Sequence, residues 1–284
     1  MITNPLIESR NAFAARHREA RISLNGRDWG YRDVGTGEVL LMIPGTLGRS
    51  DIFWNQITAL SDRLRIVAVS YPDTGDIADW ANDMTTLLDR LEIEEASVMG
   101  SSLGGYLAQY IAGTTPYRVT RLLAANTLHS AAGFDQRMPY ALDLQAVPIA
   151  ELRAGFGNGL TEWGKAHPEQ ADLVELLLQE AGGRILEPEL RVRLAALKHA
   201  PELPTMPLKS ASVVTIESDD DPLIPIDMRS AVRARLQPDV VYRFLEGGHY
   251  PYVARPEEYT SLLEQVFGLT GTGPDWGLEK VRCR

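Results

Sequence analysis

The sequence predicts an α/β protein with a mostly parallel central sheet, helices on both faces and a helical insertion. Strand-like and helix-like segments alternate from about residue 39 to 127 and again from about 211 to 267. This alternation is typical of parallel strands joined by right-handed helical crossovers. Residues 129–207 instead contain helical segments and no convincing strand. We therefore expect them to lie over the carboxyl ends of the strands, where open α/β sheets bind ligands.

The same pattern predicts how the chain is divided. Its 284 residues suffice for one large α/β domain or two small ones. We expect a core formed by residues 1–128 and 208–268, with residues 129–207 as a helical cap. Residues 269–284 are Gly-rich and polar, which predicts a loose C-terminal tail.

The first elements of the core can be predicted one by one. A short helix is expected within residues 1–20, which are polar and rich in Arg and Ala. Asn25-Gly26 lies between two alternating stretches, which is the strongest short-range signal for a β-hairpin. The continuous apolar run 39–43 is typical of a strand that is buried on both faces. Ser50 or Asp51 is expected to cap the helix that follows this strand.

The remaining elements follow from hydrophobic periodicity. Apolar runs bounded by Gly or Pro predict strands, and apolar residues three or four positions apart predict helices. Further strands are expected at 64–70, 93–99, 121–126, 211–216 and 240–245. Further helices are expected at 53–60, 77–91, 106–112, 149–156, 168–182, 188–199, 226–236 and 256–267.

Residues 100–105 form the motif on which the functional prediction depends. They read Gly-Ser-Ser-Leu-Gly-Gly, a G-x-S-x-G pattern between a strand and a helix. In that context Ser102 would lie on a sharp, strained turn that lifts its hydroxyl clear of the sheet, as a nucleophile elbow requires. Gly100 and Gly104 would remove the side chains that clash there. The alternative is a Gly-rich turn with an incidental serine.

A nucleophilic serine needs a base that takes its proton, and this base is usually a histidine. Of the five histidines we select His249, because it directly follows a predicted strand and two glycines, Gly247 and Gly248. That position brings it to the carboxyl edge of the sheet, where Ser102 is also expected. The alternative is a loop histidine without a catalytic role. The other histidines lie in the lead-in, after strand 121–126 or in the insertion: His17, His129, His167 and His199.

The carboxylate that orients the histidine has three neighbouring candidates, Asp219, Asp220 and Asp221, just after strand 211–216. Three adjacent acids are usually a solvated run, but these lie between Ser102 and His249 in sequence. Ser, Asp, His is the chain order expected with this motif. We select Asp221, because Pro222 stiffens the loop after it, and Asp220 is the second choice.

An oxyanion hole requires two convergent N–H donors. The Leu103 N–H, at the start of the helix after Ser102, is expected to supply one. We assign the other to Thr46, in the loop after strand 39–43, where Gly45 and Gly48 allow a close approach. The alternative is that residues 44–48 form a turn with no catalytic role.

Composition argues against several other classes of function. The net charge is −10, from 28 basic and 38 acidic residues, so we expect neither nucleic acid nor a membrane as a partner. Cys283 is the only cysteine, which excludes an internal disulfide and any multi-cysteine metal site. The sequence has no P-loop, dinucleotide-binding or H-E-x-x-H motif, so no metal or other cofactor is expected. We find no signal peptide and no apolar run of membrane-spanning length, and we expect a cytoplasmic protein.

Over about residues 20–268 the chain resembles the α/β-hydrolase superfamily. The resemblance is carried by Pro44-Gly45, by the G-x-S-x-G motif, by Asp221 to Pro225 and by Gly247 to Pro251. It implies an α/β-hydrolase fold with a helical cap and a Ser102–His249–Asp221 catalytic triad. The chain departs from the commoner pattern at Pro44, where a histidine usually precedes the oxyanion glycine.

Within this superfamily the chain looks closest to the maspardin-like branch. That likeness is carried by residues 51–60, 69–72, 104–109 and 247–252. Maspardin-like proteins are regarded as non-enzymatic binding relatives that lack a complete triad. This chain carries both His249 and Asp221, which favours an active hydrolase.

A serine rather than an aspartate at position 102 argues against a dehalogenase or an epoxide hydrolase. The resemblance therefore implies a serine hydrolase that cleaves a small carboxylic ester, or a related acyl compound, through an acyl-enzyme. Hydrolysis of a lactone or a carbon–carbon bond, or a non-catalytic binding or scaffold role, is the alternative. Five apolar side chains of the expected cap either line an acyl pocket or form the core of the cap, which we favour: Phe134, Met138, Tyr140, Phe156 and Trp163.

Overall fold

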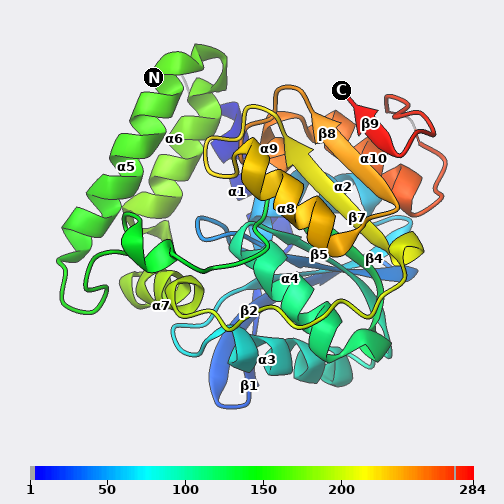
Figure 1. The fold of residues 1–284 in the computed structure, drawn as a ribbon, viewed down its shortest axis with the longest axis horizontal. Coiled ribbons are helices and arrows are strands. Elements are labelled where there is room, and N and C mark those ends of the chain that lie inside the picture. The colour runs from blue at the N-terminus through cyan, green and yellow to red at the C-terminus, as the bar shows by residue number, and fades with distance from the viewer. Residues whose placement is uncertain (1–3, 272) are drawn as a thin grey trace.

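A twisted sheet of nine strands forms the centre of the described part of the molecule (Figure 1). The computed structural model describes residues 4–271 and 273–284, so residues 1–3 of the expected lead-in and Thr272 of the expected tail lie outside it. The strands are β1 (Ala20–Leu24), β2 (Arg27–Val34), β3 (Glu38–Ile43), β4 (Leu64–Ser70), β5 (Ala96–Ser101), β6 (Val119–Ala125), β7 (Val213–Ser218), β8 (Val240–Phe244) and β9 (Val281–Cys283).

The strand order is β1-β2-β4-β3-β5-β6-β7-β8-β9. Strand β2 pairs antiparallel with β1 and β4, and every other pair in the sheet is parallel. The antiparallel pair β1–β2 is the hairpin predicted around Asn25-Gly26. The observed sheet confirms the predicted α/β fold class with a mostly parallel sheet.

Helices cover both faces of the sheet, as predicted. They are α1 (Pro5–Arg16), α2 (Trp54–Leu60), α3 (Ile77–Arg90), α4 (Leu103–Thr114), α5 (Ile149–Ala166), α6 (Ala171–Gln179), α7 (Glu187–Lys198), α8 (Ile226–Leu236), α9 (Pro251–Ala254) and α10 (Pro256–Val266). Helices α2 and α10 pack in one buried apolar cluster, and α3, α4 and α8 pack in the other. In β3, Leu40 and Met42 belong to the first cluster and Leu41 and Ile43 to the second. Burial on both faces explains why this strand is an unbroken apolar run.

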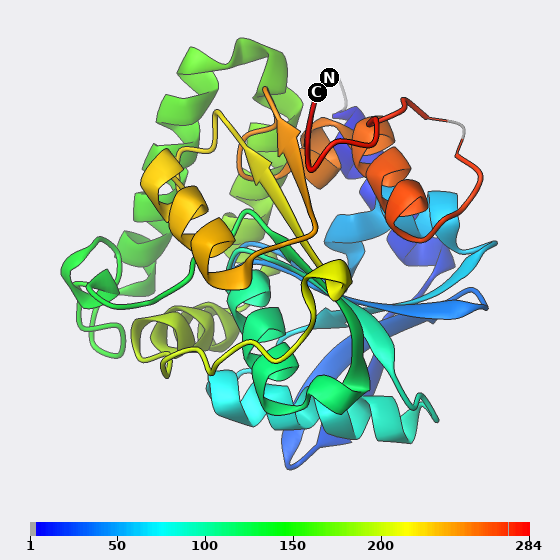
Figure 2. The ribbon, with the colours of Figure 1, turned by 45° about the vertical axis from the view of Figure 1, so that its right-hand side comes forward.

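Helices α5, α6 and α7 lie between β6 and β7 in sequence and stand together at one end of the sheet (Figures 1 and 2). Helix α5 continues to Ala166, whereas the sequence predicts an end at Phe156. Four glycines in this helix suggest an early end, since each costs about 0.5–1 kcal/mol relative to alanine. The packing of Leu160 and Trp163 against the apolar cluster explains the continuation.

Helix α1 joins the N-terminal part of the chain to this helical insertion. Asn4 donates through Nδ2 to the backbone oxygen of Asp172, at 2.9 Å. Arg10 forms an ion pair with Glu180 at 2.6 Å, and both side chains are almost completely buried. The insertion is therefore held by buried polar contacts as well as by apolar packing.

The prediction that Ser50 or Asp51 caps the next helix is wrong. These residues lie in a short 3₁₀ turn before α2, and neither α2 nor the turn has a side-chain cap. Both side chains are instead buried and take part in a polar network. Ser50 accepts a hydrogen bond from Arg32, and Asp51 pairs with Arg184 of the insertion.

The C-terminal residues also differ from the expected loose tail. Strand β9 pairs in parallel with β8, with Val281 opposite Val241, and Figures 1 and 2 show it at the edge of the sheet. Trp276 is buried, with ring-centre distances of 5.2 Å to Tyr242 and 5.0 Å to Phe244. This contact explains the ordered path, because a tryptophan buries a large apolar area. Among the described residues, none of the helices is both long and apolar enough for a membrane span.

Candidate active site

Ser102 lies between β5 and α4, at the carboxyl edge of the sheet. Its backbone has φ +55° and ψ −117°, a conformation that is strained for a residue with a side chain. Its N–H donates to the backbone oxygen of Ala125 in β6 at 3.0 Å, which ties the turn to the neighbouring strand. The sharp strand–turn–helix predicted from the G-x-S-x-G pattern is therefore present.

The glycines of this turn are required by close approach of backbone atoms. A Cβ atom on Gly100 would lie 2.0 Å from the backbone oxygen of Gly104. A Cβ on Gly104 would lie 2.2 Å from the backbone oxygen of Ile43 in β3. Because neither contact involves a flexible side chain, a larger residue cannot be accommodated by rotation of a neighbour.

His249 and Asp221 form a buried pair at the same edge of the sheet. The Nδ1 atom of His249 lies 3.0 Å from Oδ1 and 2.9 Å from Oδ2 of Asp221. The side chains of His249 and Asp221 are 5 % and 0 % exposed. A carboxylate accepts only, so Nδ1 carries the proton and Nε2 is left free to accept one.

The three adjacent acids after β7 have three different environments. Asp219 pairs with Arg229 and Arg243, each at 2.6 Å. Asp220 accepts hydrogen bonds from the N–H groups of Gly247 and Gly248, both at 2.9 Å, and so holds the loop that carries the histidine. Of the three, Asp221 is the carboxylate that contacts the imidazole.

Asn126, at the carboxyl end of β6, is a site residue that the sequence reasoning missed. Its Nδ2 lies 2.9 Å from Oδ2 of Asp221, 3.2 Å from Oγ of Ser218 and 3.3 Å from the backbone oxygen of Gly248. It therefore joins the loops after β7 and β8. Its position at the end of the strand predicted over residues 121–126 was the only signal that the sequence offered.

The Asp221 carboxyl is held in its charged form. Burial by itself raises the pKa of this carboxyl, but its interactions with the His249 imidazole, the Asn126 amide and the Leu223 N–H together outweigh burial. The pKa of Asp221 is therefore below its ordinary value, and the carboxylate is ionised at neutral pH.

Replacing Asn126 by Ala is expected to lower the free energy of unfolding by about 1.5–3 kcal/mol at pH 7, as for other hydrogen bonds to charged groups. A carboxyl whose pKa falls on folding stabilises the protein above its unfolded pKa. That stabilisation disappears as the pH falls through the folded pKa. The difference between wild type and Asn126→Ala in urea unfolding should therefore narrow as the pH falls from about 5 to about 2. Ser218→Ala, which removes a neutral acceptor, is the matched control, and a pH-independent difference for Asn126→Ala would contradict the assignment.

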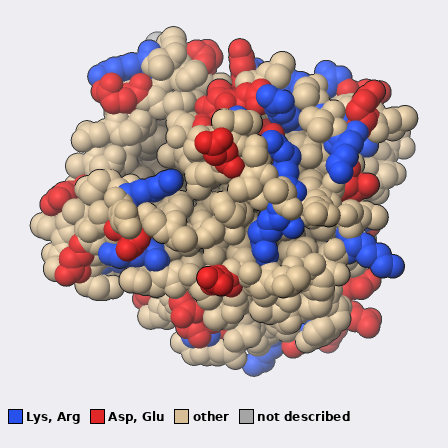
Figure 3. Space-filling view, viewed as in Figure 1, with Lys and Arg blue, Asp and Glu red and all other residues tan. Residues whose placement is uncertain are grey.

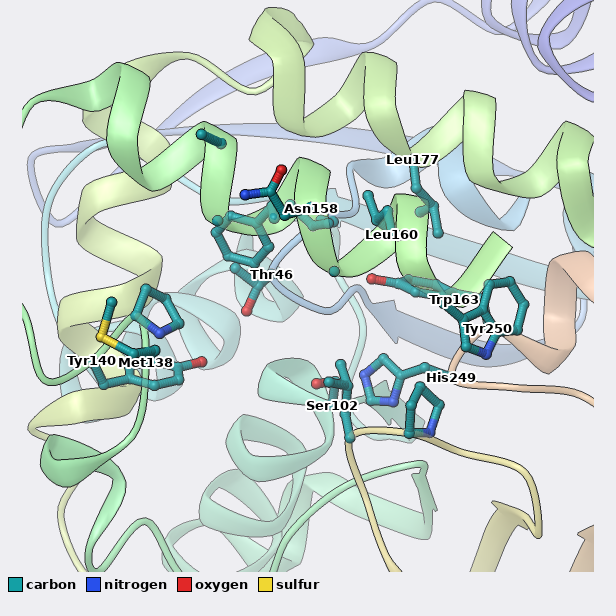
Figure 4. Close-up of a pocket in the computed structure, with 18 of the residues that line it drawn as sticks. Thr46, Ser102, Met138, Tyr140, Asn158, Leu160, Trp163, Leu177, His249 and Tyr250 are labelled. Carbon is teal, nitrogen blue, oxygen red and sulfur yellow. The ribbon is translucent and has the colours of Figure 1, made fainter. Parts of the chain in front are cut away.

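A cavity of about 590 Å³ brings Ser102, His249 and Thr46 to one site. In Figure 4, Ser102 and His249 lie at one side of it, and Leu160 of α5 and Leu177 of α6 lie across from them. Figure 3 shows that the face seen in Figure 1 is hollowed beside these helices and is largely uncharged there. Most of the lining is apolar and comes from the insertion.

Four of the five apolar residues that we expected in the core of the cap line this cavity instead: Met138, Tyr140, Phe156 and Trp163. Phe134, the fifth, is not among the lining residues and packs against Tyr140 at a ring-centre distance of 5.2 Å. Tyr250 also lines the cavity, and its hydroxyl points into it in Figure 4. Because α5 extends beyond its predicted end, Asn158, Leu160 and Trp163 add to the lining that this helix supplies.

Of the two expected oxyanion donors, Leu103 directly follows Ser102 and Thr46 lines the same cavity. Thr46 lines the cavity, and the Leu103 N–H begins helix α4, where a helix terminus attracts negative charge. Within the described residues neither N–H donates a hydrogen bond to another group. Ser102 Oγ likewise makes no hydrogen bond to His249 there, and such contacts often form only when substrate binds.

The other histidines lie outside the cavity. His167 stacks on Trp163 at 4.8 Å, and His17 lies 4.8 Å from Phe13. Across residues 4–271 and 273–284, no cluster of three or more His, Cys, Asp or Glu side chains could hold a metal ion. The groups that line the cavity include the Ser102 hydroxyl, the His249 imidazole, the Tyr250 hydroxyl and the Glu151 carboxylate.

A serine on a strand–helix turn beside an imidazole–carboxylate pair, at the carboxyl edge of a parallel sheet, is typical of the hydrolase-type α/β fold. The sequence matches the family described as "Alpha/beta hydrolase family" over residues 40–262. The chain therefore belongs to the α/β-hydrolase family, and its curated relatives place it near the maspardin-like branch.

Maspardin from Danio rerio is 24 % identical over 237 residues, which cover 81 % of this chain and 75 % of that protein. Among solved structures, a hydrolase from Pseudomonas aeruginosa PA01 superposes with a TM-score of 0.73 at 23 % identity, covering 88 % of this chain and 98 % of the other. The enol-lactonase from Burkholderia xenovorans LB400 has a TM-score of 0.70 at 14 % identity, with 88 % and 100 % coverage. The two structures support the fold.

Proposed function

We propose that this protein is a serine hydrolase that cleaves a small carboxylic ester or a related acyl compound through an acyl-enzyme. The proposal rests on one observation: Ser102 and His249 line the same largely apolar cavity, and His249 is hydrogen-bonded to Asp221. The strained backbone of Ser102 supports it, because strain of this kind is concentrated at functional sites.

In the proposed acylation step, Nε2 of His249 takes the proton of Ser102 as Oγ attacks the carbonyl carbon of the substrate. Negative charge then develops on the carbonyl oxygen, and the Thr46 and Leu103 N–H groups donate hydrogen bonds to it. The carbon–oxygen bond to the leaving group breaks, and the imidazolium returns the proton to the departing alcohol. Asp221 keeps Nδ1 protonated and stabilises the imidazolium while it exists.

Deacylation repeats these roles with water. His249 takes a proton from a water molecule, whose oxygen attacks the carbonyl carbon of the acyl-enzyme. The second tetrahedral intermediate uses the same donors, and its collapse releases the carboxylic acid and restores the Ser102 hydroxyl. The insertion, proposed as a cap over the cavity, supplies apolar contacts for the acyl group.

Two observations support other functions on this fold. The similarity to maspardin favours a binding protein with little turnover. The structural likeness to an enol-lactonase favours a lactone as the substrate. A cytoplasmic location is also part of our proposal, and a single cysteine is compatible with a reducing compartment.

Treatment with a fluorophosphonate probe tests the proposal. We expect the wild type to be labelled and Ser102→Ala to remain unlabelled, because the probe reacts with an activated serine. An unlabelled wild type would overturn the hydrolase proposal in favour of the binding role. Labelling that survives in Ser102→Ala would overturn the assignment of the nucleophile. A screen of esters of graded chain length, thioesters and lactones then identifies the preferred acyl compound.

A further inference from the structure

We propose that Arg193, a residue of helix α7 in the insertion, positions the oxyanion loop formed by residues 44–48. This inference rests on the proposed function, because it assigns a task to the Thr46 N–H in the same reaction. The Arg193 side chain does not line the cavity, so it would affect the reaction only by holding the oxyanion loop in place.

Arg193 contacts the loop directly from a fully buried position. Its Nη1 donates to the backbone oxygen of Thr46 at 2.9 Å and to that of Gly48 at 2.8 Å. Its side chain has an exposed fraction of 0 %, and Nη2 lies 3.4 Å from Oε2 of Glu189, one helical turn earlier in α7. Burial lowers the pKa of the guanidinium to about 10, with Glu189 acting in the opposite direction, so the group is still charged at neutral pH.

A hydrogen bond within the loop orients the Thr46 N–H, and Arg193 holds the peptide unit that follows it. A peptide unit is planar, so a hydrogen bond at its oxygen also orients the N–H of the next residue. The unit between residues 45 and 46 carries the Thr46 N–H, and its oxygen accepts from the Gly48 N–H at 3.0 Å. The next unit is held at the Thr46 oxygen by Arg193.

Tyr71 holds the other side of the loop. Its hydroxyl donates to the backbone oxygen of Pro44 at 2.8 Å. The Arg193 guanidinium lies 5.1 Å from the centre of the Tyr71 ring, and both side chains are fully buried. Two buried side chains, one from the core and one from the insertion, therefore fix three carbonyl groups of the loop.

Burying a charged arginine is costly unless its donors find acceptors. Apolar packing alone would not require a charge at this position, whereas the buried backbone carbonyls of Thr46 and Gly48 do require donors. The geometry points to a cavity that is complete only when α7 lies against the loop. In this way the insertion contributes to the proposed catalysis as well as covering the substrate.

The test compares Arg193→Met and Arg193→Lys with Arg10→Met, using p-nitrophenyl acetate as substrate. Arg10 is the matched control, because it is also a buried arginine that pairs with the insertion but does not contact the loop. We expect Arg193→Met to lower kcat about 10- to 100-fold and to leave KM within about 3-fold of the wild-type value. This loss of kcat is a part of the loss that removal of an oxyanion donor causes. Arg193→Lys should recover part of kcat, since an ammonium group can still donate to the carbonyls.

Amide hydrogen exchange supplies a readout that does not depend on turnover. The Gly48 amide should exchange at least 10-fold faster in Arg193→Met than in the wild type or in Arg10→Met. An unchanged kcat and an unchanged Gly48 exchange rate in Arg193→Met would overturn the inference, as would an equal loss of kcat in Arg10→Met. If the wild type shows neither turnover nor fluorophosphonate labelling, the proposed function fails, and with it the catalytic role of Arg193. Faster Gly48 exchange in Arg193→Met alone would then still support its contact with the loop.

Discussion

Asp221→Asn is expected to lower kcat/KM by about four orders of magnitude, the loss typical of this change in a Ser-His-Asp triad. An asparagine amide in place of the carboxylate presents a donor to Nδ1 of His249 and favours the wrong tautomer. It also removes the negative charge that stabilises the imidazolium. Steady-state hydrolysis of an activated ester, with thermal unfolding of the same sample, separates lost activity from lost folding.

The neighbouring acids supply the controls for this prediction. Asp219→Asn breaks ion pairs with Arg229 and Arg243, and the Asp219 side chain is 26 % exposed whereas that of Asp221 is 0 % exposed. We expect it to change kcat/KM less than 10-fold, because partly exposed ion pairs contribute little. Asp220→Asn keeps an oxygen that can accept from the Gly247 and Gly248 N–H groups, so it should be intermediate. A larger loss in Asp220→Asn than in Asp221→Asn would show that the wrong acid has been selected.

Much of the fold could be predicted because hydrophobic periodicity is a local property of the chain. The run 39–43 is apolar throughout since β3 is buried on both faces, and Asn25-Gly26 identifies the hairpin without reference to any distant residue. Strand β9 was missed for the opposite reason. Its three residues are largely exposed and show no hydrophobic periodicity. The position of the segment that leads to this strand depends on the contact of Trp276 with Tyr242, which is distant in sequence.

The candidate site likewise contains residues that could be predicted from the sequence and residues that could not. Ser102, His249 and Asp221 could be selected because each follows a predicted strand, and parallel strands end at one edge of a sheet. Asn126 could not, since its contact with Asp221 requires β6 and β7 to be adjacent, and strand order is not visible in the sequence. Arg193 lies 147 positions from Thr46 and would pass for an ordinary helical arginine. Its burial is known only from the packing of α7.

Gly100→Ala is expected to destabilise the protein by about 4 kcal/mol or more, which is exceptional for one methyl group. The new Cβ would lie 2.0 Å from the backbone oxygen of Gly104, and both residues belong to the turn that carries Ser102. Backbone atoms of a central strand and its following helix cannot rotate away, so β5 and α4 must separate. Urea unfolding, or the yield of folded protein if none survives purification, measures the effect.

Gly157→Ala, within helix α5, is the matched control for this last substitution. The nearest atom to its new Cβ is Cδ2 of Leu178, at an ordinary contact distance of 3.8 Å. Alanine also restricts the unfolded chain more than glycine does, so this variant should be more stable than the wild type by about 0.5–1 kcal/mol. The same methyl group is thus expected to act in opposite directions at the two positions. If Gly100→Ala instead unfolds within about 1 kcal/mol of the wild type, β5 and α4 are less tightly packed than the structure indicates, and the strain assigned to Ser102 would have to be reconsidered.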